Sequence, residues 1–228
     1  MFNAFLLSIL TIALNFTAIA NAEVSIEGIG ESNTDGTYIG EPVATLIKKH
    51  WQKTCKPSAN KNGSVLISLD LFFWAIVTAN GDLPADDLQE MREELEEEAG
   101  DKSISVLPLM PDLSKLSSSA RTKLNEKVPK LVTVISMFQK DGKLKRSGQQ
   151  ANELLRKYAA QNSKVKLYSY EGFLELCMAH DPCVQILANG LQKDGIHFTR
   201  QAIHLLYNLM LKPPLSTHFG EQLVDLPL

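Results

Sequence analysis

Short apolar runs alternate with longer amphipathic stretches along most of the chain. Runs that are continuously apolar or β-branched predict buried strands, whereas apolar positions three to four residues apart predict helices. The strand-like runs are residues 24–30, a segment within 64–77, and residues 103–111, 130–138 and 165–170. The helical stretches are residues 41–53, 84–99, 118–128, 147–162 and 200–211.

This alternation predicts an α/β fold. Strands that are apolar at successive positions are typical of a parallel sheet with helices on both faces. The rule that parallel crossovers are right-handed favours one open, doubly wound domain. We therefore expect a three-layer α/β/α sandwich with a mostly parallel sheet of roughly five strands, formed by residues 23–228. Residues 213–228 lack a regular pattern and are predicted to wrap over the domain as an irregular tail.

The first 22 residues have the pattern of a secretory signal peptide. Their apolar run, residues 5–16, leads to Ala20-Asn21-Ala22, a small-x-small site at which a signal peptidase would cut before residue 23. An uncleaved membrane anchor is the alternative, but Asn15 and Thr17 interrupt the apolar run. We predict cleavage and a periplasmic or secreted protein that keeps no membrane span, since no later segment has the roughly twenty apolar residues that a span needs.

Charge limits the classes of partner. The formal net charge of −3 over 228 residues gives no sign of a general affinity for nucleic acid. Residues 81–101 are strongly acidic and residues 141–146 are basic. We interpret both runs as solvated faces of helices and loops.

Three cysteines follow the predicted cleavage site: Cys55, Cys177 and Cys183. In an oxidising compartment Cys177 and Cys183 are close enough in sequence to close a small loop, which would leave Cys55 over. A metal site made of these two cysteines with His180 and Asp181 is an alternative, although its spacing is irregular for zinc.

A serine follows the first predicted strand. Ser32 lies in GIGESNTDG, residues 28–36, and active sites of open α/β sheets gather at the C-terminal ends of the strands. Gly30 lets the backbone bend before the serine, and Gly36 permits a close approach after it. A segment of this composition is also a common turn, so Ser32 alone is a weak candidate nucleophile.

A second segment supplies what a nucleophilic serine needs. In KDGIHFTRQA, residues 193–202, Asp194 and His197 are three residues apart in a predicted turn, and Thr199 is placed to cap the helix that follows. A serine hydroxyl needs a base within hydrogen-bond reach, and an imidazole oriented by a carboxylate is such a base. The alternative is a turn and a helix cap with an incidental histidine.

Together these two segments make the chain resemble the SGNH (GDSL-type) hydrolases. The matching residues are Gly30-Glu31-Ser32 after the first strand and Asp194-Gly195-Ile196-His197 before the last predicted helix. The resemblance extends over nearly all of residues 23–228 and implies a flavodoxin-like α/β/α fold. It also implies hydrolysis of an ester or acyl group, without a metal or other cofactor. Ser32 would be the nucleophile, His197 the general base and acid, and Asp194 the residue that orients the histidine.

The sequence departs from the family pattern in the blocks that hold and complete the site. Glu31 stands where the family usually has Asp, and Gly63 is a poor positional match for the glycine of the second block. The third-block candidate is Asn80, which would stabilise the oxyanion together with the backbone N–H of Ser32. Asn80-Gly81 is also a common turn pair. Asp70 and Trp74, at the end of the second predicted strand, are alternatives that would either shape the pocket or lie in the core.

The sequence therefore predicts an exported esterase or acyl hydrolase with a Ser-His-Asp triad and an acyl-enzyme intermediate. Its substrate is expected to be a small-molecule, lipid or carbohydrate ester. Two alternatives remain open at this point. One is a non-catalytic binding or accessory protein that keeps the fold, and the other is an O-acyltransferase acting on polysaccharide.

Overall fold

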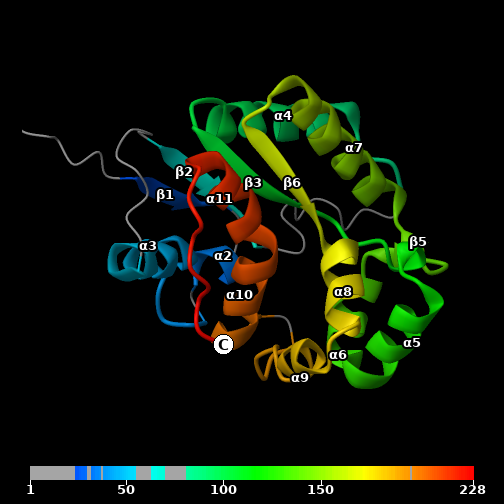
Figure 1. Cartoon of the computed structure of the whole chain (residues 1–228). Coiled ribbons are helices and arrows are strands. Elements are labelled where there is room, and N and C mark those ends of the chain that lie inside the picture. The colour runs from blue at the N-terminus through cyan, green and yellow to red at the C-terminus, as the bar shows by residue number, and fades with distance from the viewer. Residues whose placement is uncertain (1–23, 30–31, 37, 55–62, 70–80, 196) are drawn as a thin grey trace, which may run out of the picture.

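The computed structural model describes residues 24–29, 32–36, 38–54, 63–69, 81–195 and 197–228, without the side chains of Ser32 and Asp35. Within these residues four strands form one parallel sheet in the order β1-β2-β3-β6 (Figure 1). The strands are β1 (Ser25–Gly28), β2 (Ser64–Ile67), β3 (Ile104–Leu109) and β6 (Val165–Ser169). The predicted α/β fold with a parallel sheet is confirmed, with four described strands where roughly five were expected.

Both faces of the sheet are buried, as the apolar strands predict. Val65 and Ile67 of β2 point into one core, whereas Leu66 between them points into the other. Because neighbouring side chains of a strand point to opposite faces, a strand covered on both sides must be apolar throughout. The helices α4 (Ala85–Gly100) and α7 (Arg146–Gln161) cover one face (Figure 1).

The other face carries the larger core. Its helices are α3 (Val43–Thr54), α5 (Ser118–Lys127), α6 (Pro129–Ser136), α8 (Tyr170–Met178), α9 (Asp181–Ala188), α10 (Arg200–Leu206) and α11 (Lys212–Phe219). The chain is therefore a three-layer sandwich, and all four described strands end at the same edge of the sheet. That edge carries the segments in which the candidate catalytic residues lie.

One predicted strand is wrong. Residues 130–136 form most of helix α6 and residues 137–138 form the turn after it, so the strand-like composition is explained by a buried helix face. Leu131, Val134 and Ile135 are buried at helical spacing, whereas the positions between them are partly or fully exposed. Pro129 occupies the first turn, where its missing N–H costs nothing. Tertiary burial of this stripe outweighs the strand preference of the β-branched residues.

The chain beyond α6 contains short elements that the pattern did not predict. A hairpin of β4 (Gln139–Lys140) and β5 (Lys143–Leu144) turns at Asp141 and Gly142, both with positive φ. A short 3-10 turn, η2 (Leu113–Lys115), lies between β3 and α5. The basic run at residues 141–146 is thus a hairpin turn followed by the start of α7.

The C-terminal region is more regular than expected. After α10 the helix continues through a π-helical turn, η3 (Tyr207–Leu211), into α11, so the expectation of an irregular tail from residue 213 is wrong there. Pro213 and Pro214 in the first turn of α11 lack the N–H that a continuous helix uses, and the wider π-helical turn directly before them is typical of such an interruption. In this region only residues 221–228 lack regular structure, and they run back along α10 (Figure 1).

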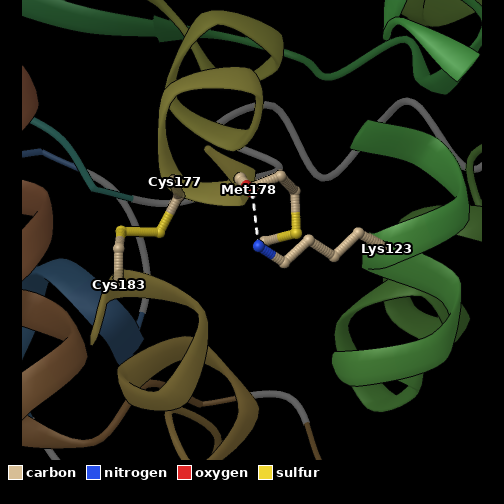
Figure 2. The surroundings of a disulfide bond; sticks show 4 residues. All are labelled: Lys123, Cys177, Met178 and Cys183. Carbon is tan, nitrogen blue, oxygen red and sulfur yellow. Dashed lines mark hydrogen bonds between the residues drawn. A yellow bond between two sulfur atoms is a disulfide. The ribbon is translucent and has the colours of Figure 1, made fainter. Parts of the chain in front are cut away.

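A disulfide joins Cys177 at the end of α8 to Cys183 in α9 (Figure 2). Both cysteines are buried. On the neighbouring helix α5, Lys123 Nζ donates to the carbonyl oxygen of Met178 at 2.9 Å and to Asp181 at 2.8 Å. The hydrogen bond to Lys123 lowers the pKa of Asp181. Lys123 thus fixes the corner between α8 and α9.

The predicted signal peptide lies outside the described residues, as does Cys55. Among the helices that the structure describes, none combines the length and the apolar character needed to cross a bilayer. The Cys177–Cys183 bond is compatible with a location outside the cytoplasm.

Candidate active site

The residues Asp194 and His197 form a hydrogen-bonded pair, as their spacing predicts. One carboxylate oxygen of Asp194 lies 2.7 Å from His197 Nδ1, and the other accepts the backbone N–H of His197 at 3.1 Å. Gly195 between them has a φ of +76°, which the turn requires. One short loop therefore supplies both the imidazole and the carboxylate.

This contact decides which nitrogen of the imidazole carries the proton. An ionised carboxylate only accepts hydrogen bonds, so the proton of the neutral ring lies on Nδ1. Nε2 then presents a lone pair, which is the state a general base needs. The side chain of His197 is 13% exposed and that of Asp194 is 34% exposed. Both side chains are therefore partly exposed to solvent.

The rest of the loop is fixed by its own backbone. The N–H of Gln192 donates to the carbonyl oxygen of His197 at 2.6 Å, and the N–H of Thr199 donates to Gly190 at 2.7 Å. Thr199 also caps α10 by accepting the N–H of Ala202, as predicted. The same turn that looks like an ordinary helix start therefore also holds the histidine.

Ser32 begins a short helix, α2 (Ser32–Asp35), directly after β1 at the C-terminal edge of the sheet. Its side chain lies outside what the structure describes. The next residues are well packed: Asn33 and Thr34 are buried, and Thr34 Oγ1 accepts the backbone N–H of Leu69 at 3.0 Å. This bond ties the helix to the chain that leaves β2.

Gly36 confirms the close approach expected after the serine. Its φ is +72°, and a Cβ on it would lie 1.8 Å from the carbonyl oxygen of Glu41. No side chain fits at this position, so the segment folds back on itself directly after α2. That return places residues 38–41 beside the loop that holds the histidine.

Four described contacts join residues 33–41 to the segment of residues 193–202. Asn33 Oδ1 accepts the backbone N–H of Phe198 at 2.8 Å. The ring of Tyr38 stacks on the ring of His197. Arg200 donates to the carbonyl oxygen of Ile39 at 2.8 Å and to Glu41 at 3.0 Å. Asn33, which follows Ser32, and Phe198, which follows His197, are thus joined by a hydrogen bond.

Glu41 forms ion pairs with both Lys49 and Arg200. Hydrogen bonds from Lys49 and then from Arg200 hold its pKa below the ordinary range. The side chain of Glu41 is 18% exposed, whereas those of Lys49 and Arg200 are 60% and 47% exposed. The ionised carboxylate therefore joins α3, the segment before it and the start of α10.

These contacts include residues that the sequence did not single out: Asn33, Thr34 and Tyr38. The sequence contained one usable signal, namely that Asn33 adjoins the candidate nucleophile. Nothing local indicates that its partner lies 165 residues away. Tyr38 carries no signal at all, because an isolated tyrosine in a polar turn has many possible roles.

The other site predictions fall on residues that the structure does not describe. Gly30, Glu31 and Ile196 are among them, as are Asp70, Trp74 and the oxyanion candidate Asn80. Gly63 is described and precedes β2, and its carbonyl oxygen accepts the N–H of Ser25 at the start of β1. It therefore lies at the opposite edge of the sheet from α2.

Comparison with known proteins adds no identity. No family model, curated protein or solved structure matches this chain. What the coordinates establish is an α/β fold with a parallel sheet.

Two further features lie elsewhere. Within the described part of the chain no three histidine, cysteine or acidic side chains gather to hold a metal ion, and the sulfurs of Cys177 and Cys183 are bonded to each other. A cavity of about 390 Å³ opens between α4 and α7, on the face of the sheet opposite α10. Its lining includes Leu88, Arg92, Arg146, Leu154, Lys157 and Tyr158.

Proposed function

We propose that this chain is an exported serine hydrolase of the SGNH type that cleaves an ester or O-acyl group. The observation that carries the proposal is the Asp194–His197 pair, held against the segment that begins with Ser32. A carboxylate on Nδ1 gives the imidazole the tautomer and orientation that serine activation requires. The position of α2 at the C-terminal edge of a parallel sheet supports it further.

The reaction would take place in two steps. The Ser32 hydroxyl attacks the acyl carbon while His197 Nε2 takes its proton, and the alcohol leaves with that proton as the acyl-enzyme forms. Water then attacks the acyl carbon and gives its proton to His197, which returns it to Ser32 Oγ. Asp194 keeps the imidazole oriented and stabilises its charge in both steps. The backbone N–H of Ser32 and the side chain of Asn80 are the proposed oxyanion donors.

Hydrolysis of a short-chain aryl ester by the purified mature protein tests this proposal. Ser32→Ala should reduce kcat/KM by on the order of 10⁴-fold or more, to the buffer background. Ser163→Ala is the matched control, because Ser163 is exposed in the turn between α7 and β6. It should keep the wild-type rate. Equal rates for Ser32→Ala and wild type would refute the mechanism.

Labelling with a serine-directed organophosphonate identifies the nucleophile independently of the substrate. The labelled peptide should contain residue 32, and Ser32→Ala should prevent labelling. Absence of labelling in folded wild-type protein would favour a non-catalytic binding protein with this fold. Product analysis with a sugar acceptor present distinguishes hydrolysis from acyl transfer.

A further inference from the structure

Tyr38 lies flat against the candidate general base. The centroids of the Tyr38 and His197 rings are 3.5 Å apart, and their planes differ by 14°. Tyr38 is 49% exposed, and it is one of few large hydrophobic residues in the described part of the chain that are exposed to solvent. Burial in the core therefore does not explain its position. The described ring contact of Tyr38 is with the imidazole of His197.

Asp194 binds Nδ1 and so restrains the imidazole along one edge of the ring. The backbone on each side is fixed, since Asn33 binds the N–H of Phe198 and Gln192 binds the carbonyl oxygen of His197. A flat neighbour on the ring face limits movement of the imidazole out of its plane. Tyr38 occupies that face.

Stacking also has an electrostatic consequence. The face of a tyrosine ring carries partial negative charge and attracts a cation placed over it. His197 becomes a cation only while it holds the proton that Ser32 gives up, so the attraction is stronger in the transition state than in the resting enzyme. An interaction of that kind raises kcat, whereas one that is equal in both states does not.

We propose that Tyr38 is a positioning residue for His197, holding the imidazole in the plane set by Asp194 and stabilising its protonated form. The catalytic part of this inference rests on the proposed function, whereas the restraint on the ring does not. Tyr38 belongs to the segment that begins with Ser32, so a single stretch of chain carries the candidate nucleophile and the support of its base. Tyr38 has no role in the chemistry of bond formation.

Two substitutions separate the aromatic contact from simple packing. Tyr38→Phe keeps the ring, and the hydroxyl that it removes makes no described hydrogen bond. Tyr38→Leu keeps apolar bulk but removes the π face. With a short-chain aryl ester we expect Tyr38→Leu to lower kcat about tenfold while KM stays within about twofold. Tyr38→Phe should retain the wild-type kcat within about twofold. Thermal melts check that both variants fold.

Proton NMR of the imidazole provides a readout that needs no turnover. Stacking at this distance shifts the carbon-bound ring protons of His197 upfield by the ring current of Tyr38, and His197→Gln assigns those signals. The shift should persist in Ser32→Ala and in Tyr38→Phe, and it should disappear in Tyr38→Leu. A structural role in loop packing alone would not make the shift depend on aromaticity.

The outcomes distinguish this inference from the proposed function. A wild-type kcat in Tyr38→Leu, or imidazole signals that do not change in that variant, overturns the role of Tyr38. If the wild-type protein neither hydrolyses esters nor reacts with the phosphonate, the proposed function fails, and the NMR signals alone decide whether Tyr38 holds the ring. An aromaticity-dependent shift then supports the restraint, and its absence refutes it.

Discussion

The pairing of Asp194 with His197 depends on a local geometry that a sequence can reveal. Three residues of turn bring the carboxylate to both the backbone N–H and the Nδ1 of the histidine, so no distant element is needed. The contacts of Asn33 and Tyr38 differ, since their partners come from the other end of the chain. The local sequence therefore predicts the Asp194–His197 pair but not the contacts that Asn33 and Tyr38 make with this loop.

Two glycines after Ser32 allow the packing of that segment to be measured. Gly36 and Gly40 both have positive φ, but only at Gly36 would a Cβ meet the backbone, at 1.8 Å from Glu41 O. Gly40→Ala should lower the free energy of unfolding by about 1 to 2 kcal/mol, the cost of the left-handed conformation. Gly36→Ala should cost several kcal/mol, because the backbone must also move.

Chemical denaturation of both variants checks this difference. Gly40→Ala is the control, since it carries the conformational strain without the clash. Equal losses of stability in the two variants would mean that residues 36–41 do not fold back on themselves in solution. The ester assay should follow the same order, with Gly36→Ala the more impaired of the two.

At the scale of elements, periodicity was more informative than residue preference. The strands β2 and β3 were predictable because they are mostly apolar and buried on both faces. Residues 130–138 are also apolar and β-branched, but the exposed positions in α6 recur at helical spacing, and Pro129 marks a helix start. The apolar and β-branched composition of this segment led to the strand prediction despite its helical spacing. The helices α8 and α9 were missed because each is short and nearly apolar.

The disulfide between α8 and α9 should stabilise the region that leads to His197. It closes a loop with a sequence separation of 6, for which the chain-entropy model gives about 2 kcal/mol. The double variant Cys177→Ala, Cys183→Ala should therefore unfold at lower denaturant concentration than wild type, with an unchanged slope. Reductant should destabilise wild type to a similar extent and leave the double variant unaffected. Coincident denaturation curves for oxidised wild type and the variant would contradict this prediction.

At the scale of the whole molecule, the last residues close the larger core. Leu223 and Leu226 are buried, and Asn208 binds Leu226 through both its carbonyl and amide groups, at 2.7 and 2.9 Å. His204 Nδ1 lies 2.6 Å from the carbonyl oxygen of Pro227, and His50 Nε2 lies 3.1 Å from that of Val224. The layered fold was predictable from the alternation of strand-like and helical patterns. The hydrogen bonds to residues 224–227 were not, because that segment has no hydrophobic periodicity.

Acid should weaken this closure through His204. Burial, the largest cause, lowers the pKa of His204, and the nearby charges of Arg200 and His50 act in the same direction. The unfolded chain therefore binds a proton that the native state resists, so stability is complete above about pH 6.5 and falls as the pH decreases below it. The expected slope is at most about 1.4 kcal/mol per pH unit.

Thermal melts of wild type and His204→Gln at pH 8, 6 and 5 measure this contribution. At pH 8 the difference between them gives the cost of replacing the histidine itself. Below pH 6.5 wild type should lose stability faster than the variant, so the two melting temperatures converge. A constant difference across the three pH values would show that His204 does not contribute to the acid sensitivity.

The bond between Asn33 and Phe198 joins positions 165 residues apart. A ribosome completes the partner of Asn33 only when most of the protein has been made, and the proposed export would release it later still. Until then the hydrogen bond between Asn33 and Phe198 cannot form, so the segment of Ser32 is not yet fixed beside His197. The proposed hydrolase activity would therefore be absent during synthesis and export, and would begin only after the complete chain has folded.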